Sequence, residues 1–273
     1  MGAYALFILL GVVQGFTEFL PVSSSGHLVL LENVLGFNPP GVTAEVALHL
    51  ATLMAVFIYY RRDIASLLTG KKAYGMRAPR AYLSLVALAT AITAGLVFPF
   101  RNTLESLTQG RQALGVLAVT FAFTALLMFV SDWLLRQPRA RAGEVTSLGW
   151  LVAAFIAVIQ AVAALPGVSR SGSTITAGIA AGLKREEAAR FSFMLFIPIS
   201  LLAVVWEAFG LLNGSETLDA ALWGPMAAGF AAALICGLIA IRLLLAVLER
   251  SRLSWFGIYL VILAFTSLIL SRI

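Results

Sequence analysis

The chain has 273 residues, of which 60% are hydrophobic and only 12% are charged, and its mean hydropathy is +0.96. A soluble domain carries about 25% charged residues, so this composition excludes an ordinary soluble enzyme and indicates a protein of the lipid bilayer. The formal net charge of +6 does not predict nucleic-acid binding, because most of the Lys and Arg residues lie in short loops between apolar runs, where they set membrane orientation.

The first apolar stretch, residues 2–35, is interrupted by Pro21 and by a serine- and glycine-rich run that ends at His27. Proline and clusters of Gly and Ser end helices, and the shorter arms beside the interruption cannot cross a bilayer. We therefore predict a re-entrant helical hairpin with its loop at membrane depth. The stretch contains no Lys or Arg, so we expect it to enter from the outside.

Three apolar runs long enough, or nearly so, to cross as helices follow at about 44–60, 82–100 and 112–134. The 61–80 and 135–146 loops are rich in Lys and Arg, so we expect both to be cytoplasmic. The basic residues concerned are Arg61, Arg62, Lys71, Lys72, Arg77, Arg80, Arg136, Arg139 and Arg141, against Asp63 and Glu144.

A second interrupted stretch, residues 147–183, breaks around Pro166 and Gly167. Three further spans are expected at about 188–209, 223–242 and 255–271. The 242–254 loop is basic and the 207–222 region is acidic, which places the first inside and the second outside. The 147–183 stretch then begins and ends inside, so we predict that it is a second hairpin. The charged residues concerned are Arg242, Arg250 and Arg252 inside, and Glu207, Glu216 and Asp219 outside.

The two interruptions match each other in sequence. Residues 20–26 align with residues 165–172 with one inserted glycine, and Gln14 aligns with Gln160. We therefore predict an all-α integral membrane protein, one domain over 1–273, built from two inverted repeats at about 1–135 and 146–273. Each repeat holds one hairpin and three spans. In inverted repeats with broken helices, the functional site lies where the breaks meet.

New helices are expected after the breaks, at about 25–35 and 172–183, and a helix N-terminus binds anions. Arg170 at membrane depth requires compensation, which phosphate oxygens provide well. An ion pair with Glu18 is the simpler alternative, and it is compatible with a role in the active site. The Ser and Thr residues beside these N-termini can either cap a helix or hold a ligand oxygen.

Glu18 is the only acidic residue near the first break, and Gln14 lies on the same helical face, four residues earlier. The carboxylate can hold a divalent metal or act as a base. His27 can accept a proton from Ser23 or Ser24, which would then attack phosphorus. Together with Arg170, this set contains the groups that phosphoryl transfer requires, and the bilayer suggests a lipid phosphate as substrate.

Residues 14–27, Gln-Gly-Phe-Thr-Glu-Phe-Leu-Pro-Val-Ser-Ser-Ser-Gly-His, and residues 166–174, Pro-Gly-Val-Ser-Arg-Ser-Gly-Ser-Thr, resemble the two signatures of the bacterial undecaprenyl-diphosphate phosphatases, the bacitracin-resistance proteins. The resemblance extends over essentially the whole chain. It implies hydrolysis of undecaprenyl diphosphate to the monophosphate and phosphate, which recycles the lipid carrier for peptidoglycan synthesis. It also implies a multi-pass protein of the bacterial plasma (inner) membrane, with its site toward the outer, periplasmic face.

The resemblance implies Glu18 as the acidic residue of the site, Ser24 and His27 as the nucleophile and base candidates, and Arg170 within the diphosphate-binding set. It further implies a divalent cation, usually Mg²⁺ or Ca²⁺, for which Glu18 is the candidate ligand. The family often has Glu where this chain has Gln14, which weighs against a metal site built on two acids. The residues that we expect to bind substrate, besides Arg170, are Gln14, Ser23, Ser25, Ser169, Ser171, Ser173 and Thr174.

Two other functions compete with this interpretation. Many secondary transporters are inverted repeats, so a transporter or flippase for a lipid carrier or small anion is the main alternative. The other membrane lipid-phosphatase superfamily needs a second histidine beyond an Arg motif, and here no histidine follows His49. The expected partners are a polyprenyl diphosphate lipid and membrane lipids, without nucleic acid, and the composition leaves room for a homodimer.

Overall fold

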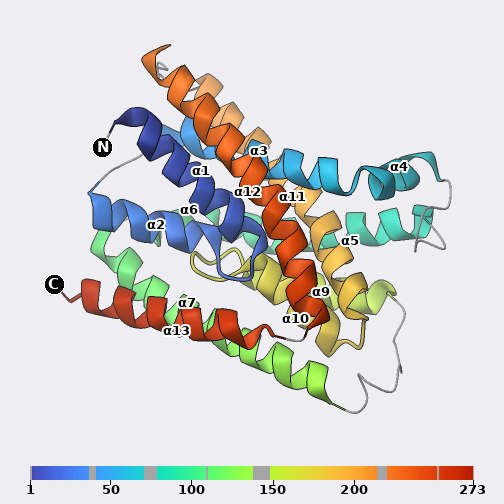
Figure 1. Cartoon of the computed structure of the whole chain (residues 1–273). Helices are drawn as coiled ribbons and strands as arrows, with labels where there is room; N and C mark the ends of the chain where they lie inside the picture. Colours follow the sequence, from blue (N-terminus) through green and yellow to red (C-terminus); the bar gives the residue numbers. More distant parts are fainter. Residues whose placement is uncertain are drawn as a thin grey trace.

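A computed structural model describes residues 2–36, 41–70, 79–108, 110–137, 148–213, 220–250 and 252–272, and within these ranges all regular structure is helical. Figure 1 shows the helices packed as one bundle. The α-helices are α1 (Ala3–Phe19), α2 (Ser24–Leu35), α3 (Gly41–Tyr59), α4 (Arg61–Thr69), α5 (Pro79–Val97), α6 (Arg101–Ser106), α7 (Gly110–Arg136), α9 (Trp150–Val162), α10 (Arg170–Ala180), α11 (Arg185–Asn213), α12 (Trp223–Glu249) and α13 (Ser254–Leu270).

Both predicted interruptions are present. The first separates α1 from α2 just around Pro21, and the second separates α9 from α10 around Pro166 and Gly167. The four arms have 17, 12, 13 and 11 residues, which at about 1.5 Å per residue is less than the thickness of about 30 Å of the hydrocarbon core. Gly167 has a φ of 86°, a left-handed conformation that glycine adopts without the steric cost of a Cβ atom.

Four helices in the described ranges are long and apolar enough to cross a membrane: α5 with its extension to Leu104, α7, α11 and α12. They correspond to four of the predicted spans. The predicted 44–60 span is α3, which is bent by 76° at its junction with α4. The predicted 255–271 span is α13, whose 17 residues make it a shorter apolar helix.

The 61–80 region differs from the predicted loop, because α4 occupies its first part. This short helix buries Leu67 while Arg61 and Arg62 are exposed, and it ends at Gly70 in the left-handed conformation. Eight of the charged residues that predicted the orientation lie outside the described residues: Lys71, Lys72, Arg77, Arg139, Arg141, Glu144, Glu216 and Asp219.

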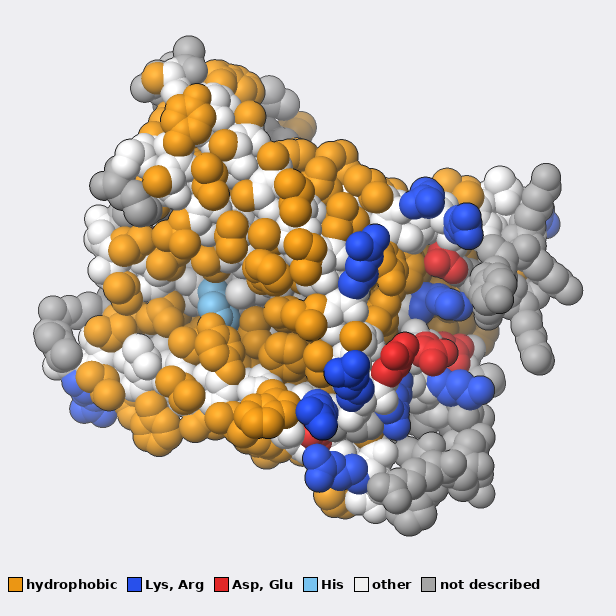
Figure 2. All heavy atoms as spheres, in the orientation of Figure 1, with side chains coloured by type: hydrophobic (Ala, Val, Ile, Leu, Met, Phe, Trp, Pro, Cys, Tyr) orange, Lys and Arg blue, Asp and Glu red, His pale blue; other side chains and the backbone are white. Residues whose placement is uncertain are grey.

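Most of the charged side chains on the face shown in Figure 2 gather at one end of the molecule, and hydrophobic side chains cover most of the rest of that face. At this end Arg190, on α11, approaches Asp63, on α4, at 4.0 Å. Arg185 donates hydrogen bonds to the carbonyl oxygens of Leu248 and Glu249 at the end of α12. A hydrophobic surface with its charges at one end is the pattern of a multi-pass membrane protein.

Close contacts through small residues hold the first interrupted segment in place. α1 packs along α12, and a side chain on Gly11 would collide with the backbone of Gly229. One on Gly15 would lie 2.6 Å from the carbonyl oxygen of Ala233. Small residues let two helices approach closely in a membrane, where van der Waals contact is the main source of association. α9 also packs against α5, and α7 against α13.

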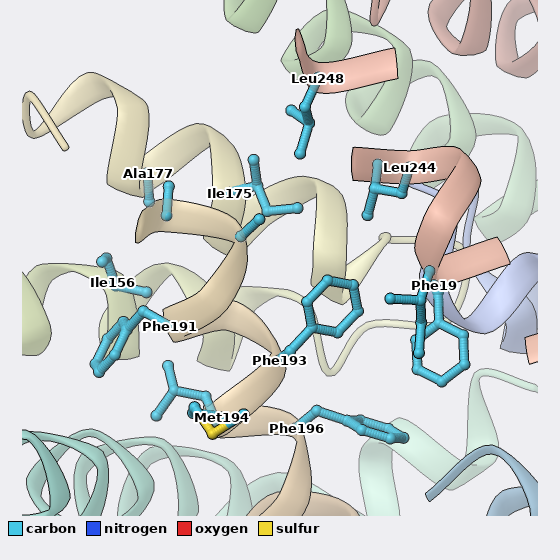
Figure 3. Packing of buried hydrophobic residues seen from close by; sticks show 14 of the residues in the cluster. Phe19, Ile156, Ile175, Ala177, Phe191, Phe193, Met194, Phe196, Leu244 and Leu248 are labelled. Atoms are coloured by element: carbon cyan, nitrogen blue, oxygen red, sulfur yellow. The ribbon is translucent and has the colours of Figure 1, made fainter. Parts of the chain in front are cut away.

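Aromatic side chains fill the centre of the bundle (Figure 3). Phe193 and Phe196 of α11 pack on Phe19 at the end of α1, with ring centroids 5.8 and 5.6 Å apart. All three side chains are almost completely buried. This cluster fixes the end of α1, and therefore the position of Glu18, against α11.

Candidate active site

The two interruptions meet near the centre of the bundle (Figure 1). The hydroxyl of Ser171, on α10, donates a hydrogen bond to the carbonyl oxygen of Leu20 at 3.3 Å. Gly26 lies so close to Gly167 that an added Cβ would be 2.9 Å from its Cα atom. Segments almost 150 residues apart therefore form one polar centre, which is the meeting of the breaks that the repeat predicts.

Glu18 is the hub of this centre. Its Oε2 atom accepts hydrogen bonds from the Ser24 hydroxyl at 2.6 Å and from the Gln14 amide at 3.0 Å. Its Oε1 atom accepts one from Arg170 Nη2 at 3.0 Å. The carboxylate is thus held by one side chain of its own helix, one of α2 and one of α10, and its charge is balanced by the guanidinium.

Arg170 lies at the first residue of α10 and is nearly buried, with 14% of its side chain exposed. Its guanidinium carbon lies 4.1 Å from the ring centroid of Phe196, a cation–π contact that helps to replace lost water. Nη2 donates to Glu18, whereas Nη1 is buried without a hydrogen-bond partner. A buried donor left free at this position is available for a ligand oxygen.

Two of the predicted site serines cap helices. Ser23 accepts a hydrogen bond from the backbone N–H of Gly26, and Ser169 accepts one from that of Gly172. This is the alternative role that Ser residues have at helix N-termini. Ser25 is exposed and lies 3.4 Å from Ser23, oxygen to oxygen.

The remaining hydroxyl groups of α10 have different surroundings. Thr174 donates to the carbonyl oxygen of Arg170 and lies 2.6 Å from the Ser192 hydroxyl. The Ser171 hydroxyl bridges to the first interruption through Leu20. The hydroxyl of Ser173, by contrast, is buried without a partner. Ser173 and the Nη1 atom of Arg170 are therefore polar groups whose hydrogen-bonding capacity is unused.

His27 lies in α2 but both of its ring nitrogens are engaged away from Ser24. Nδ1 is 2.7 Å from the carbonyl oxygen of Ser23, and Nε2 is 2.7 Å from the hydroxyl of Tyr259 on α13. The Ser24 hydroxyl is bonded to Glu18 instead. The expected proximity of His27 to the serines is present, whereas the hydrogen bond that would make it the base for Ser24 is replaced by one to the carboxylate.

Three residues of the site escaped the sequence analysis. Thr124 of α7 donates to the carbonyl oxygen of Gly167 at 3.1 Å and accepts from the backbone N–H of Ser169 at 3.2 Å. It thereby holds both ends of the turn that carries Arg170. Phe196 and Tyr259 are the others. Each lies in an apolar helix where nothing in the local pattern distinguishes it from a packing residue.

The donors present fit a divalent cation only in part. No group of three or more His, Cys, Asp or Glu side chains that suits a metal occurs in the described part of the chain. Glu18 is the one carboxylate, and the Oε1 atom of Gln14 beside it is buried without a partner. One carboxylate and one amide oxygen suit Mg²⁺ when substrate phosphates and water supply the other ligands.

Comparisons with known proteins agree with the resemblance of the two signatures. Residues 7–266 match the family described as Bacitracin resistance protein BacA. An undecaprenyl-diphosphatase of Carboxydothermus hydrogenoformans is 36% identical over 263 residues, 96% of this chain and 95% of the relative. One of Alcanivorax borkumensis is 38% identical over 263 residues, and one of Nitrosococcus oceani is 38% identical over 261 residues, each covering 94% of both chains.

Proposed function

Because this chain belongs to the family of the bacitracin resistance protein BacA, we propose that it is an undecaprenyl-diphosphatase whose reaction takes place at the Glu18 cluster. The observation that supports this site is the carboxylate of Glu18, which accepts hydrogen bonds from Ser24 at 2.6 Å and from Arg170 at 3.0 Å. A proton acceptor, a hydroxyl nucleophile and a phosphate-binding cation thus lie in direct contact. Phosphoryl transfer requires this combination.

The diphosphate binds, in this proposal, at the N-terminus of α10. The Arg170 Nη1 atom and the Ser173 hydroxyl are buried without partners there. A helix N-terminus adds a partial positive charge and free backbone N–H groups. The cluster has two formal charges, Glu18 and Arg170, which nearly cancel. The incoming phosphate then competes with Glu18 for the guanidinium, and this competition frees the carboxylate to accept a proton.

Ser24 is the proposed nucleophile. Its oxygen forms a bond to the terminal phosphorus, the bond from that phosphorus to the bridging oxygen breaks, and undecaprenyl phosphate leaves. The proton of the Ser24 hydroxyl passes to Glu18, to which it is already hydrogen bonded. Water then attacks the phosphorus, the bond from phosphorus to the Ser24 oxygen breaks, and Glu18 returns its proton to that oxygen, so that phosphate leaves and both side chains are restored. Arg170 balances charge on the phosphoryl oxygens throughout.

A divalent cation, if it binds with the diphosphate, would be held by Glu18 and by the free Oε1 atom of Gln14. Bound there, it would supply additional positive charge to the phosphoryl oxygens. The protein's own side chains perform the remaining tasks: Arg170 orients the diphosphate, Gln14 holds the carboxylate, and Ser24 reacts.

The proposed topology is an inverted repeat with two re-entrant hairpins, α1–α2 and α9–α10. Reciprocal packing supports it, since α1 lies on α12 while α9 lies on α5, and α3 lies on α12 while α11 lies on α5. In the repeat, α1 corresponds to α9, α3 to α11 and α5 to α12. Each contact in one half therefore has its counterpart in the other half. We place the basic end of the molecule inside and the opening of the site toward the outer face.

Phosphate release by purified protein in detergent tests this function. Undecaprenyl diphosphate and farnesyl diphosphate are supplied, each with and without a chelator, and free phosphate is measured. Release that Arg170→Ala abolishes supports the proposal. A transporter built on the same repeat would release no phosphate, and this result from folded wild-type protein would overturn the proposal.

Trapping distinguishes Ser24 from a directly activated water. Rapid quenching with acid followed by mass spectrometry would detect a phosphate on the peptide that contains Ser24. Ser24→Ala would remove both this adduct and turnover. Full turnover by Ser24→Ala would assign the attack to water, with Glu18 as its base.

A further inference from the structure

Ser23 has a strained backbone at the point where the active-site loop turns into α2. Its φ is 70°, which makes it the only residue other than glycine at positive φ in the described ranges. Such a conformation costs about 1–3 kcal/mol in a residue with a Cβ atom and persists only where its surroundings impose it. The next residue is Ser24, whose hydroxyl contacts Glu18 at 2.6 Å. The conformation of Ser23 therefore decides where the proposed nucleophile lies.

His27 holds the carbonyl group of this strained residue. The Ser23 carbonyl oxygen accepts from the His27 backbone N–H at 3.2 Å and lies 2.7 Å from Nδ1 of the ring. A carbonyl oxygen can only accept, so Nδ1 carries the hydrogen. In the neutral ring, Nε2 is then an acceptor, and the Tyr259 hydroxyl 2.7 Å away donates to it.

Two aromatic rings also contact the imidazole. The Tyr259 ring stacks on it with centroids 5.6 Å apart and planes 19° apart, and Phe121 meets it edge-on at 5.7 Å. Tyr259 itself is 41% exposed on α13, and its hydroxyl is turned inward to the histidine. A hydrogen bond in surroundings of low polarity is stronger than the same bond in water.

We infer that Tyr259 is a positioning residue: acting through His27, it holds the strained Ser23 and so directs the Ser24 hydroxyl at Glu18. This inference rests on the proposed function. It assigns a role in that function to a residue of α13, since Tyr259 is 232 positions from His27. Tyr259 does not touch the diphosphate. It affects the rate of the reaction step and leaves substrate binding to Arg170 and α10.

The test uses Tyr259→Phe, which removes the hydroxyl and keeps the stacked ring. We expect kcat to fall about three- to tenfold, the equivalent of one hydrogen bond, while KM for undecaprenyl diphosphate stays within about twofold. Thr266→Val is the matched control, since Thr266 lies exposed on the same helix and its hydroxyl bonds only to the carbonyl oxygen of Ile262 among the described contacts. It should retain wild-type kcat.

A double variant tests whether Tyr259 acts through the histidine. His27→Ala combined with Tyr259→Phe should be no slower than His27→Ala alone. Additive losses, or an unchanged kcat in Tyr259→Phe, would overturn the inference.

Nitrogen-15 NMR of histidine-labelled protein in detergent provides a readout that does not depend on turnover. The Nε2 resonance of His27, assigned by comparison with His49→Gln, should move toward the value of a free acceptor in Tyr259→Phe and not in Thr266→Val. An unmoved resonance would overturn the positioning role of Tyr259 even if the chain is fully active. Absence of phosphate release by the wild-type chain would instead overturn the proposed function.

Discussion

Arg170 donates a hydrogen bond to Glu18 over 3.0 Å, although the two residues are 152 positions apart. They come from different interruptions of the bundle, and both are almost fully buried. The contact joins the two interrupted segments electrostatically at the proposed site of substrate binding. It also means that changing one partner leaves the other as a buried, unpaired charge, a state that costs about 3–5 kcal/mol.

Arg170→Ala should therefore lower both activity and stability. We expect turnover to fall by at least about 100-fold, because a cation on the phosphoryl oxygens is lost. Arg136→Ala is the control: Arg136 pairs with Asp132 at 3.5 Å but is largely exposed, and Asp132 keeps hydrogen bonds from the backbone N–H groups of Leu253 and Ser254, so both properties should change little. Phosphate release and thermal unfolding in detergent are measured together.

The double variant Arg170→Ala with Glu18→Gln separates the two effects. Removing both charges should recover much of the lost thermal stability while activity stays absent. If activity returned together with stability, Arg170→Ala would have lost its activity because it failed to fold. Arg170 would then have no part in the reaction.

Substitutions of His27 can distinguish two roles of its ring: holding the Ser23 carbonyl group, or acting as a general base. His27→Ala should lose at least about 100-fold in activity if the ring is a base. Asn at this position can donate its amide to the Ser23 carbonyl oxygen, as Nδ1 does at 2.7 Å, but it cannot take up a proton. We therefore expect His27→Asn to retain clearly more activity than His27→Ala. Equal losses, measured as kcat on folded protein, would favour the base.

Substitutions of Gln14 can test whether a divalent cation binds beside Glu18. Its Nε2 atom donates to Glu18 at 3.0 Å while its Oε1 atom has no partner. If a divalent cation binds between these side chains, Gln14→Glu should lower the concentration of Mg²⁺ or Ca²⁺ that gives half-maximal phosphate release. Gln14→Met, which removes the amide oxygen without adding charge, should raise it. A dependence on cation that is the same in both variants and in the wild type would show that position 14 touches no metal.

The orientation of the chain can be measured with single cysteines. In a Cys236→Ala background, Val34→Cys lies at the exposed end of α2 and Leu68→Cys on the exposed face of α4. The proposed topology places the first outside and the second inside. A membrane-impermeant maleimide added to intact cells should label Val34→Cys alone, and permeabilised cells should show both. The reverse labelling would invert the topology and place the opening of the site on the cytoplasmic side.

Local chemistry explains which features of the fold were predictable. Pro21 and Pro166 each stand beside a cluster of Gly and Ser residues, a combination that ends helices, so both interruptions were visible in the sequence. Glu18 and Arg170 are isolated charges in apolar surroundings, which makes them functional candidates wherever they occur. α4 was missed because its arginines and Asp63 suggested a loop, whereas the buried Leu67 gives it one apolar side.

The supporting residues could not be found in this way. Tyr259 and Thr124 contact residues 232 and 43–45 positions away, respectively, and each lies in an apolar helix. The left-handed Ser23 was equally hidden, because a serine in this conformation is stabilised by tertiary contacts and not by its own preference. The candidate reacting groups were therefore visible from residue type, whereas the residues that contact them from other helices depend on the packed structure.

Gly26 tests whether the two interruptions must touch. A Cβ atom at this position would lie 2.6 Å from the Phe121 ring and 2.9 Å from the Cα atom of Gly167, so Gly26→Ala must push the first loop away from the second. Displacement of a reacting group by about 1 Å can cost 100-fold in rate, and we expect kcat to fall about 10–100-fold. Gly95→Ala is the matched control, since an added Cβ there meets nothing within 4 Å and alanine favours the helix. It should leave kcat unchanged and thermal stability equal or higher. Wild-type kcat in Gly26→Ala would mean that Ser24 and Arg170 do not need the contact between the loops to work together, and the proposed shared site would then have to be abandoned.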